Sequence, residues 1–284
     1  MKHVVRISDG LGNQLFQYAF AYALHRETGA EVLIDPLFWG TSIRHYDLEK
    51  FNISIKKKLV SPAMDYLLGF GPRNGRRFKN VYRNIIIDKK YKRVNEELVM
   101  KYDDDMFHQN SNSFFEGFWQ TYKYFDKYKN EIKKEFMPLW PLSEKAKEYL
   151  VKIEEKPSVA IHIRRTDYVR SNGNVALDLS YYSKAIEVIS GLLKDYNVFA
   201  FSDDKDFVKR NLKINNYIMV EGVSDLDEFE LLRRCNHKII ANSTFSWWAA
   251  YLGDNSDSIV IAPEVDMWTG DFYPPEWNII KAQL

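Results

Sequence analysis

The chain has 284 residues, of which 45% are hydrophobic, so it can bury a large core, and we expect two domains. Its 40 lysines and arginines nearly cancel 39 aspartates and glutamates, which gives no overall charge that favours nucleic acid or an anionic membrane. A single cysteine, Cys235, excludes an internal disulfide, the six histidines form no group with metal-ligand spacing, and no apolar stretch approaches the roughly 20 residues that span a bilayer.

The chain opens with a predicted strand, a glycine turn and a helix. An apolar run leads to two glycines, the second of them Gly12, and a second apolar run after the helix ends in Asp35. This order is typical of a dinucleotide-binding turn, but Leu15 stands where that fingerprint has its third glycine, which lets helix and strand pack closely. The amides of Asn13 and Gln14 indicate that side chains, rather than bare backbone, address the ligand.

The middle of the chain is less regular. Residues 40–110 are basic in places and interrupted by glycine and proline, which predicts loops and short helices. The acidic run 103–105 has a spacing that could hold a divalent metal, but a solvated loop is the better interpretation. A strand over 113–118 and a charged helix follow, and Pro138 and Pro157 bracket a hinge region with one helix in it.

From about Pro157, apolar runs alternate with helical patterns up to the end of the chain. This alternation predicts a doubly wound parallel sheet. We therefore expect two α/β domains, at 1–152 and 153–284, whose strands face each other with their carboxyl ends. Ligands of open α/β sheets bind at those ends, so the residues that follow each strand are the candidates for function.

The motif HIRRTDY places two arginines at the end of a strand. Alternation along SVAIHIR puts His162 and Arg164 on one face, and Arg165 and Asp167 follow in the loop. Arginines at this position can make bidentate, charge-assisted bonds to a diphosphate. The alternative is a structural salt bridge to Asp167 or another carboxylate.

The motif FSDDKDF also ends a predicted strand. Ser202, Asp203 and Asp204 stand between that strand and the next helix. A carboxylate here could accept hydrogen bonds from a nucleotide base or ribose. It could equally be only the N-cap of the helix.

The motif IIANSTFSWWAAYLG turns from a buried run into a helix at Asn242, Ser243 and Thr244. Free backbone N–H groups at a helix N-terminus, together with small hydroxyls, form an anion site. An ordinary N-cap, with Trp247 and Trp248 in the core, is the alternative. Because the arginine of the preceding motif is expected at the same crevice, we favour the anion site.

Four motifs, GLGNQLFQYA, HIRRTDY, FSDD and NSTFSWWAA, in this order and with this spacing, resemble the bacterial α-1,2-fucosyltransferases of glycosyltransferase family 11, as does the closing YPPEWNII. The resemblance implies a GT-B-like architecture of two facing Rossmann-like domains, the C-terminal one holding GDP-fucose and the N-terminal one the acceptor. It further implies inverting transfer from GDP-β-L-fucose to the 2-hydroxyl of a galactoside, with no required metal and no cofactor.

The resemblance also assigns roles to individual residues. Arg164 would hold the diphosphate with support from His162 and Arg165, and Asn13 with Gln14 would approach from across the cleft. Asp167 is the candidate catalytic base, although orienting an arginine is an equally good role for it. Together with the residues that follow the predicted strands, the predicted donor-binding residues are Gly12, Asn13, Gln14, His162, Arg164, Arg165, Ser202, Asp203, Asp204, Asn242, Ser243 and Thr244.

Other functions remain open on the sequence alone. A nicotinamide-dependent oxidoreductase would explain the first glycine turn but not the later motifs, and a non-catalytic glycan-binding protein would explain the 15% aromatic content but not the arginines. Another nucleotide-sugar transferase of the same fold is the nearest rival. We expect a cytoplasmic protein, at most peripherally bound to the inner face of the membrane, whose acceptor is a galactose-terminated oligosaccharide or a lipid-linked or lipopolysaccharide glycan, with no nucleic-acid partner.

Overall fold

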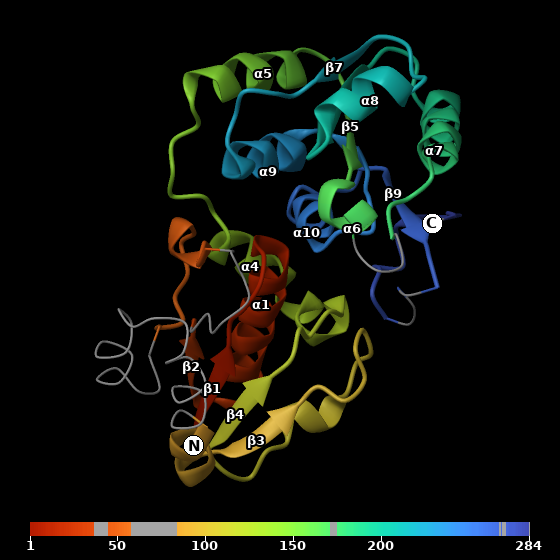
Figure 1. Cartoon of the computed structure of the whole chain (residues 1–284). Coiled ribbons are helices and arrows are strands. Elements are labelled where there is room, and N and C mark those ends of the chain that lie inside the picture. Colours follow the sequence, from red (N-terminus) through yellow and green to blue (C-terminus); the bar gives the residue numbers. More distant parts are fainter. Residues whose placement is uncertain (37–44, 58–83, 171–174, 267, 269–270, 284) are drawn as a thin grey trace. The chain divides into compact units, whose positions relative to one another are not determined.

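The computed structural model describes residues 1–36, 45–57, 84–170, 175–266, 268 and 271–283 (Figure 1). The chain forms two compact units, Met1–Leu139 with Gly270–Phe272, and Trp140–Thr269 with Tyr273–Leu284. The sequence-based boundary at 152–153 lies inside helix α5 (Glu144–Glu155). That helix packs on α9 (Asp225–Arg234), so the whole of it belongs to the second unit.

Unit 1 is built on a parallel sheet in the order β2-β1-β4-β3. The first helix, α1, is buried along most of its length, because alanines and aromatic residues surround its axis rather than lining one side. Gly29 ends it in the left-handed conformation, with φ of 65°. The elements are β1 (Lys2–Arg6), α1 (Leu11–Thr28), β2 (Glu31–Asp35), η1 (Leu48–Lys50), β3 (Lys92–Asn95), η3 (Asp104–Phe107), β4 (Ser113–Glu116), η4 (Tyr122–Tyr124), η5 (Asp126–Tyr128) and α4 (Lys129–Glu135).

Unit 2 contains a parallel sheet in the order β10-β9-β8-β5-β6-β7. All six residues of β5 are buried, as expected for the central strand of a sheet covered on both faces. The remaining elements are β5 (Ser158–Ile163), α6 (Thr166–Arg170), α7 (Leu179–Leu192), β6 (Asn197–Ser202), α8 (Lys205–Asn211), β7 (Tyr217–Met219), β8 (His237–Ile239), α10 (Thr244–Leu252), β9 (Val260–Glu264) and β10 (Asn278–Lys281).

Each sheet reverses its winding once, which confirms the predicted doubly wound parallel architecture. In unit 1 the chain moves from β1 to β2 on one side and returns to place β4 on the other. In unit 2 it moves from β5 to β6 and β7, and then places β8 on the other side of β5. The gap between the carboxyl ends of two such strands is where open α/β sheets bind ligands. The switch points are therefore β1/β4 in unit 1 and β5/β8 in unit 2.

Among the residues that the structure describes, no helix is both long and apolar enough to cross a bilayer.

Candidate functional site

Arg164 lies directly after β5, at the switch point of unit 2. Its Nε and Nη2 atoms donate to the two carboxylate oxygens of Asp167, at 2.9 and 2.8 Å, and Nε lies 3.2 Å from Asp203 Oδ2. The side chain keeps about a fifth of its surface exposed, 20%. Since the Asp167 pair uses the Nε and Nη2 atoms, Nη1 remains for a ligand, and no hydrogen bond joins it to any described residue.

Asp203 directly follows β6, the neighbouring strand, and fixes the loop that carries the arginines. Its Oδ1 accepts a hydrogen bond from the backbone N–H of Arg165 at 2.9 Å. Its Oδ2 accepts two from Thr166, one from the backbone N–H at 3.1 Å and one from Oγ1 at 2.6 Å. The sequence predicted that this carboxylate either binds a nucleotide or caps a helix. In the structure it instead holds the backbone of the arginine loop.

The cap of α8 is Asp204, whose Oδ1 accepts from the backbone N–H of Phe207 at 3.1 Å. Ser202 Oγ in turn accepts from the backbone N–H of Asp204 at 3.0 Å. Of the two interpretations given for this motif, the N-cap therefore describes Asp204. Ser202 is 1% exposed, which leaves its side chain committed to the turn.

Arg165 packs against α8. The centre of its guanidinium lies 3.3 Å from the centroid of the Phe207 ring, and its Nε is 3.7 Å from Asp204 Oδ2. Stacking on an aromatic ring is favourable for a guanidinium, which is planar and weakly hydrated. The two neighbouring arginines therefore have different surroundings, and contact with a diphosphate would require Arg165 to leave this ring.

His162 is buried beneath the same loop, within β5. Burial, followed by the nearby positive charge of Arg164, lowers the pKa of His162 to about 3. Its ring lies 5.7 Å from that of Phe245, between centroids, and Nδ1 has no hydrogen-bond partner among the described residues. A neutral imidazole adds no positive charge to a diphosphate, so support from His162 would come through packing.

The loop after β8 completes this edge of unit 2. Helix α10 begins at Thr244 with Ser243 as its N-cap, and the Ser243 side chain makes no capping hydrogen bond. Asn242 Nδ2 donates to Val175 O at 2.9 Å, while its buried Oδ1 has no partner among the described residues. Tyr168 Oη donates to the backbone carbonyl of Asn242 at 2.9 Å, which joins the arginine loop to the start of α10.

Because β6, β5 and β8 are neighbours, the structure brings these three predicted motifs together at one edge of the sheet. Trp247 and Trp248 point into the core instead, each with 0% exposure.

The glycine turn belongs to unit 1 and lies at the β1/β4 switch point. Asn13 is partly exposed, and its Oδ1 accepts from Gln120 Nε2 at 3.0 Å. Gln14 is fully buried: Nε2 donates to the carbonyls of Asp9 and His45 at 2.8 and 2.7 Å, and Oε1 accepts from Asp47 N at 2.9 Å. Direct donor binding by Gln14 would break these bonds, so its position favours holding the turn. Gly12 is buried at the start of α1.

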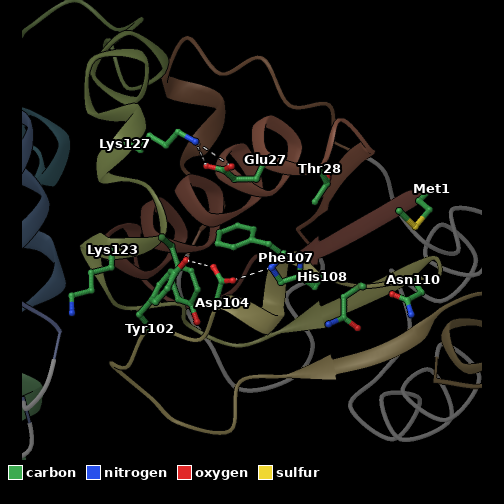
Figure 2. A pocket seen from close by; sticks show the side chains of 12 residues that line it. Met1, Glu27, Thr28, Tyr102, Asp104, Phe107, His108, Asn110, Lys123 and Lys127 are labelled. Carbon is green, nitrogen blue, oxygen red and sulfur yellow. Dashed lines mark hydrogen bonds and ion pairs between the residues drawn. The ribbon is translucent and has the colours of Figure 1, made fainter.

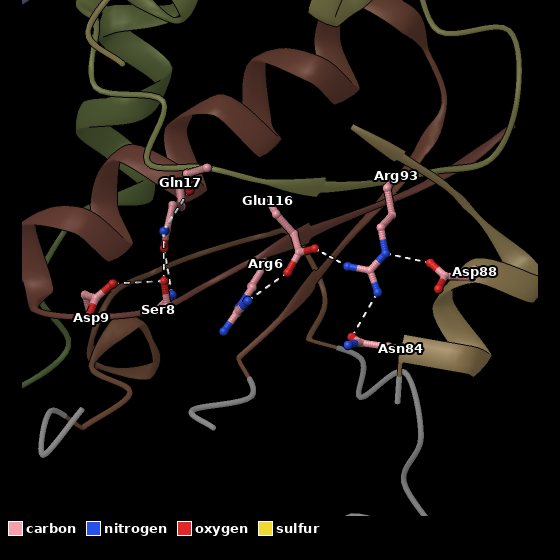
Figure 3. A network of polar contacts seen from close by, with 9 residues as sticks. Arg6, Ser8, Asp9, Gln17, Asn84, Asp88, Arg93 and Glu116 are labelled. Carbon is pink, nitrogen blue, oxygen red and sulfur yellow. Dashed lines mark hydrogen bonds and ion pairs between the residues drawn. The ribbon is translucent and has the colours of Figure 1, made fainter. Parts of the chain in front are cut away.

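Sequence reasoning missed a group of charges at the same switch point. Arg6 ends β1, Glu116 ends β4, and they form an ion pair of 2.7 Å (Figure 3). Glu116 also accepts from Arg93 of β3, which is bound in turn by Asp88 at 2.6 Å. The available signal was a charged residue at the end of an otherwise apolar strand, which is the signal that identified Arg164 in unit 2.

Metal-binding groups are absent from the part of the chain that the structure describes, since no three His, Cys, Asp or Glu side chains gather in a way that could hold an ion. In the acidic run 103–105, Asp103 Oδ1 accepts from the backbone N–H of Asp105 at 3.0 Å, and Asp104 is bound by Tyr102 and His108. The run forms η3 and its cap, on the surface.

Comparison with known proteins identifies the family. A model of glycosyl transferase family 11 matches residues 3–281. An alpha-1,2-colitosyltransferase of Escherichia coli is 30% identical over 274 residues, which cover 92% of this chain and 90% of the relative. Galactoside alpha-(1,2)-fucosyltransferase 2 of Sus scrofa is 24% identical, covering 96% of this chain and 78% of the relative.

Among solved structures, NodZ alpha-1,6-fucosyltransferase soaked with GDP-fucose superposes with a TM-score of 0.50 at 17% identity, covering 88% of this chain and 92% of that one. This likeness supports the fold, which is of the GT-B type. Because the family model spans nearly the whole sequence, the chain belongs to glycosyl transferase family 11.

Proposed function

We propose that this protein transfers L-fucose from GDP-β-L-fucose to the 2-hydroxyl of a terminal β-galactoside, with inversion at the anomeric carbon and without a metal ion. The observation that carries the proposal is the position of Arg164 and of the start of α10, which lie after the neighbouring strands β5 and β8. A diphosphate bound there would meet a guanidinium and a helix N-terminus together.

The chemistry requires groups of this kind. Cleavage of the bond between fucose and phosphate leaves an oxocarbenium-like sugar and a diphosphate whose negative charge grows. A fixed guanidinium and a helix dipole stabilise that charge without reorganisation, which is the part that a metal ion plays in other transferases. Because these protein groups would supply the stabilising charge, we expect activity to survive treatment with a chelator.

For Asp167, the pair with Arg164 supports an orienting role. Its two oxygens face Nε and Nη2 of Arg164, an arrangement that fixes the plane of the guanidinium. A late proton transfer from the acceptor hydroxyl leaves little for a base to do, which is compatible with this role. A pH-rate profile of Asp167→Asn tests it, because loss of the acidic limb would instead identify Asp167 as the base.

A second donor also has support. The Escherichia coli relative, at 30% identity, is named a colitosyltransferase, and colitose is fucose without its 3-hydroxyl. The deciding experiment is an array of GDP-fucose and GDP-colitose against galactosides, with the linkage of each product determined by NMR. We expect turnover with GDP-fucose and an α-1,2 linkage to galactose. Preference for GDP-colitose would establish the second donor. A rise in the melting temperature of the protein with NAD(H) but not with GDP would contradict both donors.

A further inference from the structure

A pocket of about 750 Å³ lies in unit 1 beside the C-terminal part of α1 (Figure 2). Small-molecule sites typically enclose about 300–1,000 Å³, so its size is suitable for a ligand. One side is formed by Glu27 and Thr28 of α1, and another by the stretch from Tyr102 to Asn110. None of the motifs assigned to the donor contributes to it. We call it the flank pocket.

The flank pocket has an aromatic wall made of three rings. The ring centroids of Tyr102 and Tyr124 are 5.1 Å apart, and those of Phe107 and Tyr124 are 5.8 Å apart. Behind them, Phe20 of α1 packs on both Phe107 and Tyr124. Tyr102 itself remains 36% exposed, so one ring is presented to a ligand on a rigid support.

The charged side chains around this wall are already paired within unit 1. Lys127 Nζ lies 3.0 Å from Glu27 Oε1, and Lys123 Nζ lies 2.7 Å from the Asp271 carboxylate. These pairs neutralise the two lysines and leave the carboxylate of Asp104, whose partners are Tyr102 and His108. An anion would have to displace a carboxylate from its lysine and would also meet Asp104, so an uncharged ligand with hydroxyl donors is the better match.

Asp104 supplies the hydrogen-bonding side of the flank pocket. Its Oδ1 accepts from Tyr102 Oη at 2.6 Å, and its Oδ2 is 2.9 Å from His108 Nε2. A carboxylate offers about four acceptor positions on its two oxygens, so hydroxyl donors of a ligand can still bind beside these two. An exposed aromatic ring next to a fixed carboxylate suits a sugar, whose C–H face stacks while its hydroxyls donate.

The flank pocket is distant from the glycine turn within unit 1. Glu27 is near the C-terminal end of α1, and Gly12 is near its N-terminal end. At about 1.5 Å per residue the helix separates these two residues by roughly 22 Å. A sugar in the flank pocket would therefore not be the one that reacts at the switch point.

We propose that the flank pocket binds a neutral sugar residue of a glycan, and that in the enzyme this residue belongs to the non-reacting part of a long acceptor. The identity of the glycan as acceptor rests on the proposed function. Binding of a neutral sugar to the pocket does not rest on the proposed function, because it can be measured without any transfer reaction.

The first experiment measures binding to the full chain by saturation-transfer NMR, with a neutral galactose-terminated tetrasaccharide and with inorganic phosphate as probes. We expect Tyr102→Ala to weaken tetrasaccharide binding about tenfold, equivalent to the loss of one stacked ring. Tyr102→Phe keeps the ring and should bind within about twofold of the unchanged chain. The matched control is Leu98→Ala, an exposed apolar residue (60%) that precedes this stretch and does not line the pocket.

The second experiment compares acceptors in the transfer assay. Tyr102→Ala should raise KM for the tetrasaccharide about tenfold. The value of kcat, KM for lactose and KM for the donor should stay unchanged. If Tyr102→Ala fails to fold, Asp104→Asn, which keeps the ring, is expected to weaken tetrasaccharide binding about threefold.

Three results would overturn the proposal. The first is equal binding of the tetrasaccharide by Tyr102→Ala and by the control Leu98→Ala. If Tyr102→Ala does not fold, the equivalent result is equal binding by Asp104→Asn and by the unchanged chain. The second is displacement of the tetrasaccharide by phosphate, which would indicate an anion site. The third is a dimer that Tyr102→Ala dissociates, which would make the pocket a contact between copies. Absence of transfer with intact tetrasaccharide binding would instead contradict only the proposed function.

Discussion

The carboxylate of Asp203 holds the backbone of Arg165, with Oδ1 2.9 Å from the amide nitrogen. The two residues are far apart in sequence, but they follow neighbouring strands of unit 2. The direction of the loop after β5, and with it the position of Arg164, therefore depends on a side chain supplied by β6.

Asp203→Asn should weaken donor binding by about tenfold, because the amide retains one acceptor oxygen for Arg165 N or for Thr166, but not for both. We expect donor KM to rise while acceptor KM stays constant, since the change acts through the arginine loop. Steady-state kinetics with each substrate varied in turn provides the measurement. Asp206→Asn, an exposed carboxylate in the following helix α8, is the control and should leave both constants unchanged.

Arg164→Ala should nearly abolish transfer, because removal of one group that stabilises developing charge typically costs about 3–4 kcal/mol of barrier. Arg164→Lys keeps the charge but not the fork that pairs with Asp167, so it should recover only part of the rate. Initial rates of GDP release with lactose as acceptor measure both variants. Retention of more than about a tenth of the original rate by the alanine variant would refute the assignment of Arg164.

Burial of His162 should make the free energy of unfolding depend on pH. Its pKa is about 3 in the folded protein, below its ordinary value of 6.5, so between these values only the unfolded chain takes up the proton. The free energy of unfolding therefore falls as pH falls below 6.5, by up to about 1.4 kcal/mol per pH unit, and is unaffected by this group at higher pH.

Urea unfolding at pH 7, 6 and 5 should accordingly give a shallower pH dependence for His162→Leu than for the unchanged chain. Asn52→Ala, an exposed site without a titrating side chain, is the control and should retain the original dependence. Equal slopes for all three proteins would show that another group is responsible.

Substitution of Gln17 should destabilise unit 1. Its Oε1 accepts from Ser8 N at 2.8 Å and its Nε2 donates to Gly117 O at 3.0 Å, which joins the loops after β1 and β4 (Figure 3). Gln17→Leu leaves both backbone groups without a partner and should cost about 2–4 kcal/mol of unfolding free energy. Urea denaturation is the measurement, with exposed Asn52→Ala expected to change stability by less than about 0.5 kcal/mol.

The sequence contained enough information for the sheet type and for the position of Arg164, because alternation along β5 is a local property. It did not reveal that Asp203 holds the arginine loop or that Arg165 stacks on Phe207. Both depend on which strand lies beside β5, and strand order is set by packing across the whole unit. Which unit contains α5 depends in the same way on packing, in this case on its contact with α9.

The two glutamines of α1 hold neighbouring loops of unit 1 by hydrogen bonds from their side-chain amides. Gln14 and Gln17 join the segments around Asp9, His45 and Gly117 through neutral amides. Amides carry no charge for salt to screen and no proton to lose in ordinary buffers, whereas the loop in unit 2 is fastened by the carboxylate of Asp203. The glycine turn of unit 1 is thus held by neutral amide hydrogen bonds, whereas the arginine loop of unit 2 is held by a charged carboxylate.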